Sequence, residues 1–506
     1  MRPPRRAFAC LLGAALFVLM PAARAVAGGT LRIGLNEDPD VLDPAQGGFF
    51  VDRIVFAATC DKLIDTDAKN DFVPQLATGW QWSPDGMSLT LKLRDGVRFQ
   101  DGEVLDADAV KATITRDQTL PGSLRKGELK PVSAVDVVDP HTVRFVLGAP
   151  YAPLVAVLAD RAGMIMAPRA MARLGKNVAN ELPCAGPFKL TQRVPQDKIV
   201  VDRFPGYWNS AAIKLDRIVY EPIPSTTVRL VDLKAGQLDM VERLQPTDIA
   251  AVRADPKLKL VTATALAYET ISLNVAHGPR AATFADPRVR LALAASIDRS
   301  VLNKVVLAGQ FVPSNQFEAP GTRYWDPEHP VPPRDLAKAR LLLQQAGVQH
   351  PSFTLMVGTD PVAQQAGQVI QAMAGEAGFV VKVQAIEANA ADAAEQAGNY
   401  DAAMELWSGR PDPDGNVSIW LACNGFANWG KYCNPAFDAL LAKARSVTDV
   451  PTRQALYRKV VDMYLRDMPH IVLYHYRWLW ALSSKVSGFT PTPDGLIRPL
   501  GIDIAP

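Results

Sequence analysis

Several short stretches of the chain alternate between apolar and polar residues. Leucines occupy every second position at the start of "SLTLKLRDGVRF" (88–99), and an Asp-Gly pair in the same stretch marks a turn. Side chains of a β-strand point to opposite faces in turn, so a period of two predicts a strand with one buried face. The same alternation predicts strands at residues 30–35 and 142–147.

The later part of the chain combines strand and helix patterns. Residues 353–358 form an apolar run, and Asp360-Pro361 then provides the N-cap and first residue of a helix that continues to about Glu376. A second apolar run follows at residues 379–386. A strand, a helix and a strand in this order predict two parallel strands joined by a right-handed crossover.

Two more helices are predicted in this part of the chain. Asp286 and Pro287 can begin one of them, and its apolar stripe continues through Val289, Leu293, Ser296 and Ile297. The other covers residues 453–468 and leads into a strand at 470–476. Strands and helices alternate over much of the chain, so the predicted fold class is α/β.

His470 and His475 both fall within the predicted strand at 470–476. They are five residues apart, so a regular strand would direct them to opposite faces. We therefore interpret them as structural histidines rather than as a pair that acts together.

Length and charge narrow the class of protein. The chain has 506 residues, which favours two or three domains. Its 48% hydrophobic and 21% charged residues are typical of globular proteins. The formal net charge of +2 lacks the basic excess of most nucleic-acid-binding proteins, so no nucleic-acid partner is expected.

Residues 1–27 have the organisation of a signal peptide. A basic segment, "MRPPRR", precedes an apolar core, and small residues then offer cleavage sites after Ala25 and Ala27. Cys10 lies inside the apolar core rather than at a cleavage site, which argues against a lipid-anchored form. No later stretch reaches the roughly 18 apolar residues of a membrane-spanning helix. We expect an exported protein that works in an oxidising compartment.

Four cysteines follow the predicted signal peptide. Export leads to an oxidising compartment, where disulfides persist. Cys423 and Cys433 would close a short loop and are the first pair expected. Cys60 and Cys184 are the pair that remains.

The common signatures of catalysis are missing from the sequence. It contains no Gly-x-Ser-x-Gly nucleophile elbow and no His-Glu-x-x-His zinc motif, and its six histidines are scattered. Residues 425–432 fit Gly-x4-Gly-Lys but end in tyrosine, where a phosphate-binding loop needs serine or threonine. We expect neither an enzyme nor a bound metal or organic cofactor.

"WSGRPDPDGN" (407–416) concentrates polar side chains between glycines and prolines. Asp412, Asp414 and Asn416 match the first ligand positions of a calcium loop, but valine and cysteine stand where that loop needs glycine and glutamate. The two aspartates could also be a carboxylate pair that performs hydrolysis, although the sequence indicates no partner group. The remaining interpretations are the wall of a ligand pocket and a surface turn.

A family resemblance is clearest in "VPQLATGWQWSPDGMSLTLKLRDGVRFQDGEVLDADAV" (73–110). This stretch resembles the signature of the extracytoplasmic solute-binding proteins of the peptide/nickel family (family 5), which serve ABC importers. Similar motifs of that family are "CAGPFKL" (184–190), "GYW" (206–208), "FADPRVRLALAASIDRSVL" (284–302) and "LAKARLLLQQAG" (336–347). The resemblance therefore extends over essentially the whole mature chain.

The resemblance implies a two-lobed periplasmic-binding-protein fold of type II, in its large three-domain form, with a hinge between the lobes. The domains expected from it are lobe I (28–57, 185–275 and 478–506), an extra domain (58–184) and lobe II (276–477). Cys60 and Cys184 then lie near the two ends of the extra domain, which favours a disulfide between them.

The resemblance also implies a function. The protein would be the periplasmic substrate-binding component of an ABC transporter, which captures a peptide or peptide-like small solute between its lobes and delivers it to the permease. Solute contacts on both lobes would stabilise the closed form that the importer recognises. The permease and ATPase are other chains, so membrane contact would be transient, and we expect a monomer.

The resemblance places residues 407–416 in the ligand pocket. In peptide-binding relatives, the segment after a tryptophan of lobe II supplies an aspartate to the amino group of the peptide. Here Trp407 would form an apolar wall, and Arg410 stands where dipeptide binders have that aspartate. The candidate ligand-binding residues are Trp407, Arg410, Asp412, Asp414, Trp429, Tyr268 and Asn274.

The chain departs from the dipeptide binders at both ends of the expected peptide. Arg410 replaces the aspartate, and "GTDPVA" (358–363) has no basic residue where those proteins carry an arginine for the peptide carboxylate. A modified peptide, a peptide-like amide or an anionic solute fits no worse than a standard dipeptide. A receptor for a metal chelate and an exported hydrolase remain as alternatives.

Overall fold

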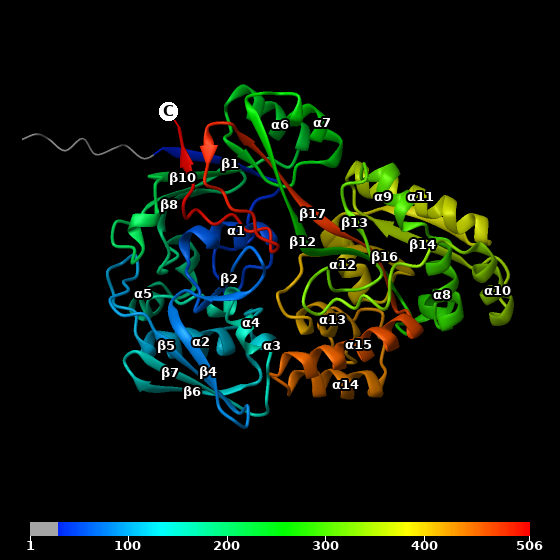
Figure 1. Ribbon diagram of the computed structural model, residues 1–506, viewed down its shortest axis with the longest axis horizontal. Coiled ribbons are helices and arrows are strands. Elements are labelled where there is room, and N and C mark those ends of the chain that lie inside the picture. Colours follow the sequence, from blue (N-terminus) through cyan, green and yellow to red (C-terminus); the bar gives the residue numbers. More distant parts are fainter. Residues whose placement is uncertain (1–28, 506) are drawn as a thin grey trace, which may run out of the picture.

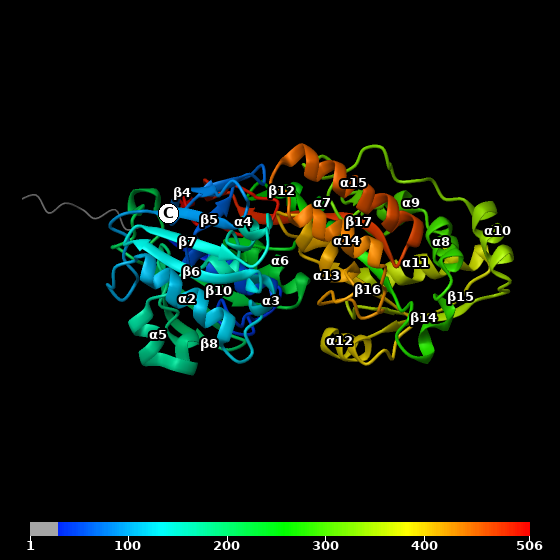
Figure 2. The same ribbon diagram turned by 90° about the horizontal axis from the view of Figure 1, so that it is seen from below.

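The computed structural model describes residues 29–505, and these form two parts that lie side by side (Figures 1 and 2). The predicted signal peptide, its cleavage sites and Cys10 fall outside the described residues. Among residues 29–505, no helix is both long and apolar enough to cross a membrane.

One eleven-stranded sheet extends through both parts. Along its main path the strands are β15 (Val380–Ala385), β14 (Ser352–Val357), β16 (Ala402–Trp407), β12 (Leu258–Leu273), β17 (His470–Ser483), β11 (Met240–Val241), β1 (Thr30–Leu35), β10 (Arg217–Pro222), β9 (Lys198–Arg203) and β8 (Phe188–Val194), and β13 (Val312–Pro313) pairs with β17. The long antiparallel strands β12 and β17 run from one part into the other (Figure 1). They are the two segments that cross between the lobes.

Lobe I is built around β1 and β8–β11. Strand β1 pairs with β10 and β11 in parallel, and β8, β9 and β10 pair in antiparallel order. The helix α1 (Phe50–Thr59) is buried along almost its whole length against this sheet. The other helices of this region are α6 (Thr226–Ala235) and α7 (Ile249–Arg253), and the short strands β18 (Val486–Ser487) and β19 (Asp503–Ile504) pair with each other.

The extra domain contains a four-stranded antiparallel sheet and its own apolar core. Its strands are β4 (Ala77–Trp82), β5 (Ser88–Leu93), β7 (Thr142–Leu147) and β6 (Val132–Asp139). The hairpin of β2 (Ile64–Thr66) and β3 (Phe72–Pro74) and the helices α2 (Ala107–Thr119), α3 (Lys126–Leu129), α4 (Leu154–Val157) and α5 (Pro168–Leu174) complete this region. The leucines of β5 are buried on one face, as the alternation predicts.

Lobe II confirms the predicted strand–helix–strand unit. Strands β14 and β15 pair in parallel and are joined by α11 (Pro361–Ala377). The Asp360 carboxylate accepts hydrogen bonds from the first backbone amides of α11, which satisfies donors that the helix itself cannot pair. The other helices of this lobe are α8 (Pro287–Ser296), α9 (Arg299–Val306), α10 (Leu336–Ala346), α12 (Ala388–Gln396), α13 (Asp414–Leu421), α14 (Pro435–Arg445) and α15 (Val450–Asp467).

The strand after α15 differs from the prediction in two ways. It continues to Ser483, well past the expected end at residue 476. A register irregularity interrupts its pairing with β12 between Glu269 and Thr270, so the regular alternation fails there. His470 and His475 consequently belong to one aromatic cluster with Tyr268, Phe317 and Trp420, and the expectation of opposite faces is wrong.

Both predicted disulfides are confirmed. Cys423 and Cys433 are bonded with their Cα atoms 4.4 Å apart, and Cys60 and Cys184 with theirs 4.9 Å apart. The second bond joins the end of α1 to the segment before β8, so it connects the two places where the chain enters and leaves the extra domain.

The predicted domain boundaries stay a proposal. Three large buried apolar clusters support it, one around the lobe I strands, one in the extra domain and one in lobe II. Met164, Met166 and Met171 pack in the lobe I cluster although they lie within the expected extra domain. The two regions therefore share a packed boundary near the Cys60–Cys184 bond.

Candidate ligand-binding site

Residues 407–416 lie where lobe II faces the rest of the molecule. Strand β16 ends at Trp407, and the chain leaves the sheet and turns before α13 begins at Asp414. Gly409 adopts a positive φ of 78°, and a Cβ atom there would lie 2.4 Å from Cβ of Leu266. Only glycine fits this turn, which brings the next residue, Arg410, to the junction between the lobes.

Arg410 and Trp407 form a stacked pair at this junction. The Arg410 guanidinium carbon lies 4.3 Å from the centroid of the Trp407 ring. A second tryptophan, Trp420, packs edge-on against Trp407 at 5.9 Å. Arginine on the face of tryptophan is a favourable cation–π arrangement. The two predicted pocket residues therefore act as one unit, with an apolar plate and a planar cation.

Asn416 holds the turn in this conformation. Its side-chain oxygen accepts hydrogen bonds from the Arg410 amide at 2.7 Å and from Trp407 Nε1 at 3.2 Å. Its amide nitrogen donates to the Arg410 carbonyl at 3.0 Å and to Glu318 Oε1 at 2.7 Å. Sequence reasoning did not assign Asn416 this role. The available signal was an amide side chain in the first turn of a short helix, beside Asp414.

Asp412 and Asp414 point into lobe II rather than toward the junction. The Asp412 carboxylate binds both terminal nitrogens of Arg453, one of them at 2.7 Å, and both side chains are buried. Asp414 accepts from Arg445 Nε at 2.7 Å and from Ser418. Burial alone would lower the pKa of Arg453, but the Asp412 carboxylate raises it far above its usual value. Both aspartates thus anchor the segment to α14 and α15.

The other three candidate residues contact lobe II, although the expected boundaries assign Tyr268 and Asn274 to lobe I. Tyr268 is fully buried, donates to the Asn416 carbonyl at 2.8 Å and accepts from Trp420 Nε1 at 2.7 Å. Asn274 is also fully buried, and its amide bridges the carbonyls of His277 and Tyr400. Trp429 is partly buried beside α12, next to Phe426 on the loop that the Cys423–Cys433 bond closes.

Asp160 is the partner of Arg410 on the opposite side of the junction. Its Oδ2 lies 3.5 Å from Arg410 Nε, and its Oδ1 lies 3.1 Å from Arg53 Nε and 3.8 Å from Arg161 Nε. Three guanidinium groups therefore surround one carboxylate. Arg53 comes from α1, Arg161 follows Asp160 directly, and Arg410 belongs to lobe II. Sequence reasoning missed this group because its members are far apart in the chain.

The pKa values at the junction follow from burial and charge. Burial alone would raise the pKa of the Asp160 carboxyl, but Arg53, Arg161 and Arg410 lower it well below its usual value. Burial lowers the pKa of Arg410 to about 10 and that of Arg161 to about 9, with Arg125 as a further cause for Arg161. Asp160 is therefore ionised at neutral pH, and the arginines gather close enough to disfavour one another's charge.

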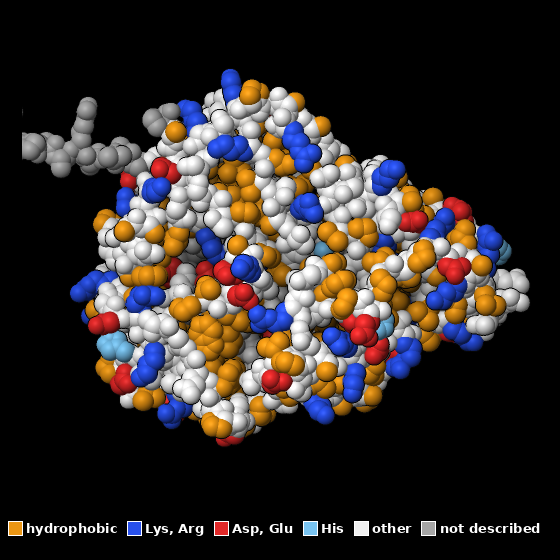
Figure 3. All heavy atoms as spheres, in the orientation of Figure 1, with side chains coloured by type: hydrophobic (Ala, Val, Ile, Leu, Met, Phe, Trp, Pro, Cys, Tyr) orange, Lys and Arg blue, Asp and Glu red, His pale blue; other side chains and the backbone are white. Residues whose placement is uncertain are grey.

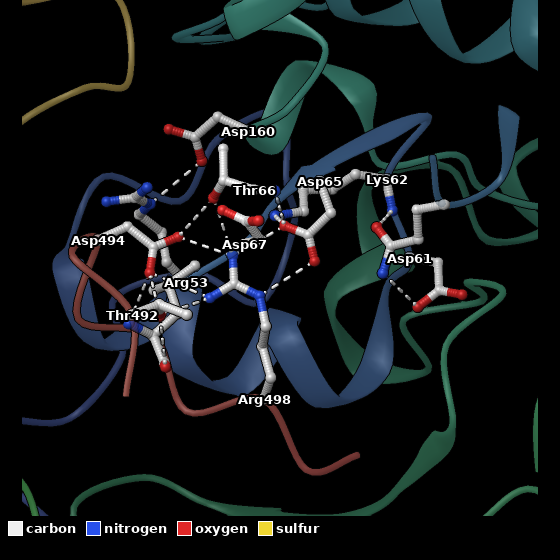
Figure 4. A network of polar contacts seen from close by, with 12 residues as sticks. Arg53, Asp61, Lys62, Asp65, Thr66, Asp67, Asp160, Thr492, Asp494 and Arg498 are labelled. Carbon is white, nitrogen blue, oxygen red and sulfur yellow. Dashed lines mark hydrogen bonds and ion pairs between the residues drawn. The ribbon is translucent and has the colours of Figure 1, made fainter. Parts of the chain in front are cut away.

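A second polar network lies beside Arg53 (Figure 4). Arg498, from the C-terminal segment, is placed between Asp65 of β2 and Asp494 and bonds to both. Lys62 also bonds to Asp65. These two acids are thereby neutralised by their own basic partners, and this network ties the C-terminal segment to the β2–β3 hairpin.

Acidic side chains collect near the end of β16 on the lobe II side. Burial raises the pKa of Glu269 to about 7, although Tyr476 donates a hydrogen bond to it at 2.5 Å. Glu405 and Glu395 lie next to each other, and burial followed by their mutual repulsion raises the pKa of Glu405 well above its usual value. The space-filling view shows acidic and basic side chains close together near the middle of one face (Figure 3).

A cavity of about 350 Å³ lies between the lobes, and residues 407–416 are not among those that line it. Its walls are residues 69–71 of the β2–β3 hairpin, 264–266 of β12, 319–323 of lobe II and Pro493. Arg323 bonds to Asp71 across it at 2.6 Å. Its volume suits a small solute. Within residues 29–505, no group of three or more His, Cys, Asp or Glu side chains is arranged to hold a metal ion.

The comparisons with known proteins match this architecture. The family model of bacterial extracellular solute-binding proteins, family 5, matches residues 71–428. The glutathione-binding protein GsiB of Salmonella paratyphi A is 28% identical over 483 residues, which cover 93% of each chain. The structure of the binding protein AgaA from A. tumefaciens R10, in complex with agropinic acid, has a TM-score of 0.83 at 24% identity and covers 94% of this chain and 99% of that one. The Helicobacter pylori protein DppA in complex with the peptide STSA also has a TM-score of 0.83 at 24% identity, with 94% and 98% covered.

The chain belongs to the family 5 extracellular solute-binding proteins. It has their two-lobed α/β fold and serves as the solute-binding component of an ABC importer. Proteins of this family work with a permease and an ATPase, and its characterised members are periplasmic. The family expectation from the sequence is therefore confirmed.

Proposed function

We propose that this protein captures a peptide or peptide-like solute between its lobes at the Trp407–Arg410 unit and delivers it to the permease without changing it chemically. The position of Arg410 supports this proposal above all. It is stacked on Trp407 and directed at Asp160 across the lobe junction, so it is placed where closure brings the lobes together. Asp412 and Asp414 would position this unit rather than contact the solute.

The chemistry of the unit suits an amide-containing solute with an acidic group. A tryptophan face packs against apolar and amide groups, and a guanidinium offers a planar set of donors to a carboxylate. The relative GsiB is named as a glutathione-binding protein, and glutathione is a peptide-like solute with two carboxylates. It is therefore the first compound to test on this chain.

We also propose that the chain is exported to the periplasm with its signal peptide removed after Ala25 or Ala27, and that it acts as a monomer. The basic segment, apolar core and small residues of the first 27 positions support cleavage. Residues 29–505 contain three large buried apolar clusters of their own.

Two measurements test the proposed function. Native mass spectrometry of freshly purified protein should reveal any retained solute, and calorimetry with glutathione and a panel of dipeptides and tripeptides should give one site per chain with a Kd in the micromolar range or below. The released solute should keep its mass after prolonged incubation with the protein. Retention of a metal chelate, absence of peptide binding, or turnover of the solute would each contradict the proposal.

A further inference from the structure

Four arginines from separate segments converge on the lobe junction. We call Arg53, Arg125, Arg161 and Arg410 the arginine group. Arg125 stands just before α3 and bonds to Glu128 at 2.8 Å, and the other three surround Asp160. Arg53, Arg125 and Arg161 are each only 3% exposed. The Arg410 side chain is 16% exposed.

The arginine group carries more positive charge than its neighbours neutralise. Its four cations face two carboxylates, those of Asp160 and Glu128. Asp117 also lies near Arg125, but burial raises the pKa of its carboxyl well above its usual value. Asp52 on α1 does not add a third, because burial and Asp40 raise the pKa of its carboxyl to about 9. Asp65 and Asp494 are already paired with Arg498 (Figure 4). A surplus of positive charge therefore remains at the junction.

Several guanidinium nitrogens of the group also lack hydrogen-bond acceptors. Nη1 of Arg53, Nε of Arg125 and Nε of Arg161 are buried, and no other described residue accepts a hydrogen bond from them. A buried donor without an acceptor and a buried charge without a counter-charge both destabilise the folded state. Arg290 and Arg299 are also buried without an acid paired to them among residues 29–505, but backbone carbonyls accept their hydrogen bonds. The arginine group differs because three of its guanidinium groups surround one carboxylate and several of their nitrogens have no acceptor in the described part of the chain.

Access to the group depends on the hinge. Arg410 belongs to lobe II, and Arg53, Arg125 and Arg161 belong to the opposite side of the junction. Separation of the lobes would break the contact between Arg410 and Asp160 and open the group to a solute. Closure would then place the anion of the solute among the four guanidinium groups, away from bulk water.

We propose that the arginine group is an anion subsite, which binds a carboxylate or a similar oxyanion carried by the captured solute. This inference rests on the proposed function and narrows its substrate class to anionic solutes. Asp160 holds the arginines in position and limits the affinity for the anion by its own negative charge. The bidentate geometry of guanidinium groups suits a carboxylate, and several such groups favour a solute with more than one anionic oxygen.

The first test compares acids with their esters on the full mature chain. Calorimetry is performed with glutathione, with its diethyl ester and with peptides from the panel in free-acid and amide form. We expect the acid to bind at least about 30-fold more tightly than the neutral form. Arg161→Gln and Arg125→Gln should remove most of this preference. Arg217→Gln, which removes an exposed arginine from its pair with Asp202, is the matched control. This variant should still prefer the acid over the neutral form.

The second test uses inorganic phosphate and a charge change of the opposite sign. Phosphate should raise the thermal unfolding midpoint of the wild-type chain above that in chloride of equal ionic strength. The Asp160→Asn variant should bind phosphate at least about tenfold more tightly than the wild-type chain and show a larger rise of the unfolding midpoint. The reason is that the substitution removes a negative charge within 4 Å of three guanidinium groups. Asp160→Asn therefore tests the anion subsite even if an arginine variant fails to fold.

The outcomes separate the two proposals. Equal binding of acid and neutral solutes, together with no phosphate effect, would overturn the anion subsite and leave peptide capture intact. Phosphate stabilisation that depends on the arginines, without binding of any peptide, would support the subsite for a free anion and contradict the peptide as solute. A phosphate effect that Arg161→Gln and Asp160→Asn leave unchanged would also overturn the subsite.

Discussion

Arg410 and Asp160 form an ion pair across the lobe junction, with Arg410 Nε 3.5 Å from Asp160 Oδ2. The two residues are 250 positions apart in the chain, and the fold brings them together at the lobe junction. The pair connects residues 407–416 of lobe II to α1 and the extra domain through Arg53 and Arg161. It therefore couples the conformation of the cleft to the charge inside it.

Arg410→Ala should weaken solute binding by roughly 30-fold or more, since truncation of one partner in a buried charged contact typically costs about 2–5 kcal/mol. Trp407→Ala should also weaken binding, because it removes the apolar plate beneath the guanidinium. Calorimetry with a solute that the wild-type chain binds measures both effects. Arg217→Ala on the exposed face of β10 serves as the control, and near-native affinity of folded Arg410→Ala and Trp407→Ala would exclude the segment from the site.

Asp412→Ala should destabilise the fold strongly and affect the solute only indirectly. The substitution leaves Arg453 buried without its carboxylate, a change that typically costs about 3–5 kcal/mol. Asp286→Ala, which removes the cap of α8 and an exposed ion pair with Arg288, should cost about 1 kcal/mol. Chemical denaturation of both variants gives the comparison. A stable Asp412→Ala variant that has lost solute affinity would instead place Asp412 in direct contact with the solute.

The two disulfides should contribute unequally to stability. The Cys423–Cys433 bond closes a loop of 10 residues and is worth about 2–3 kcal/mol in the chain-entropy model, whereas the Cys60–Cys184 bond spans 124 residues and is worth about 4–5 kcal/mol. The double variant Cys60→Ala/Cys184→Ala should therefore unfold at lower denaturant concentration than Cys423→Ala/Cys433→Ala. The reverse order would show that loop length does not govern these bonds.

Glu269 should make the fold less stable as pH rises. Burial raises the pKa of its carboxyl from 4.5 to about 7 in the folded chain, so the folded chain binds more protons than the unfolded chain between these values. The free energy of unfolding then falls as pH increases from 4.5 to about 7, by about 3 kcal/mol in total for this group.

Glu269→Gln isolates this contribution. The variant should be less dependent on pH than the wild-type chain across the same window, because glutamine keeps the contact with Tyr476 and does not ionise. Denaturation curves at several pH values, compared between the two proteins, provide the measurement. Parallel pH profiles for both would show that Glu269 already ionises normally in the folded state.

Expression of the full chain in a bacterium with a periplasm tests the export proposal. Osmotic shock should release a soluble protein whose N-terminus is Val26 or Gly28, because cleavage is expected after Ala25 or Ala27. N-terminal sequencing and the intact mass identify the start. Recovery of the uncleaved chain in the membrane pellet would contradict cleavage.

Local patterns in the sequence were sufficient to predict individual elements. The strand–helix–strand unit from β14 to β15 and the caps of α8 and α11 were all predicted, because each depends on residues within about 30 positions of one another. The short Cys423–Cys433 loop was predictable for the same reason. The family motifs then supplied the arrangement of the lobes, which periodicity alone does not specify.

The sequence by itself determined the α/β class, the family and the two disulfides, and it singled out residues 407–416 as a candidate site that stays a prediction. The tertiary structure alone decided what that segment faces. Asp412 and Asp414 are adjacent to Arg410 in sequence, yet they pair with Arg453 and Arg445, and Arg410 pairs with the distant Asp160. The physical reason is that a charged side chain at a packed junction takes the counter-charge that the fold brings within about 4 Å, and sequence separation does not determine that distance.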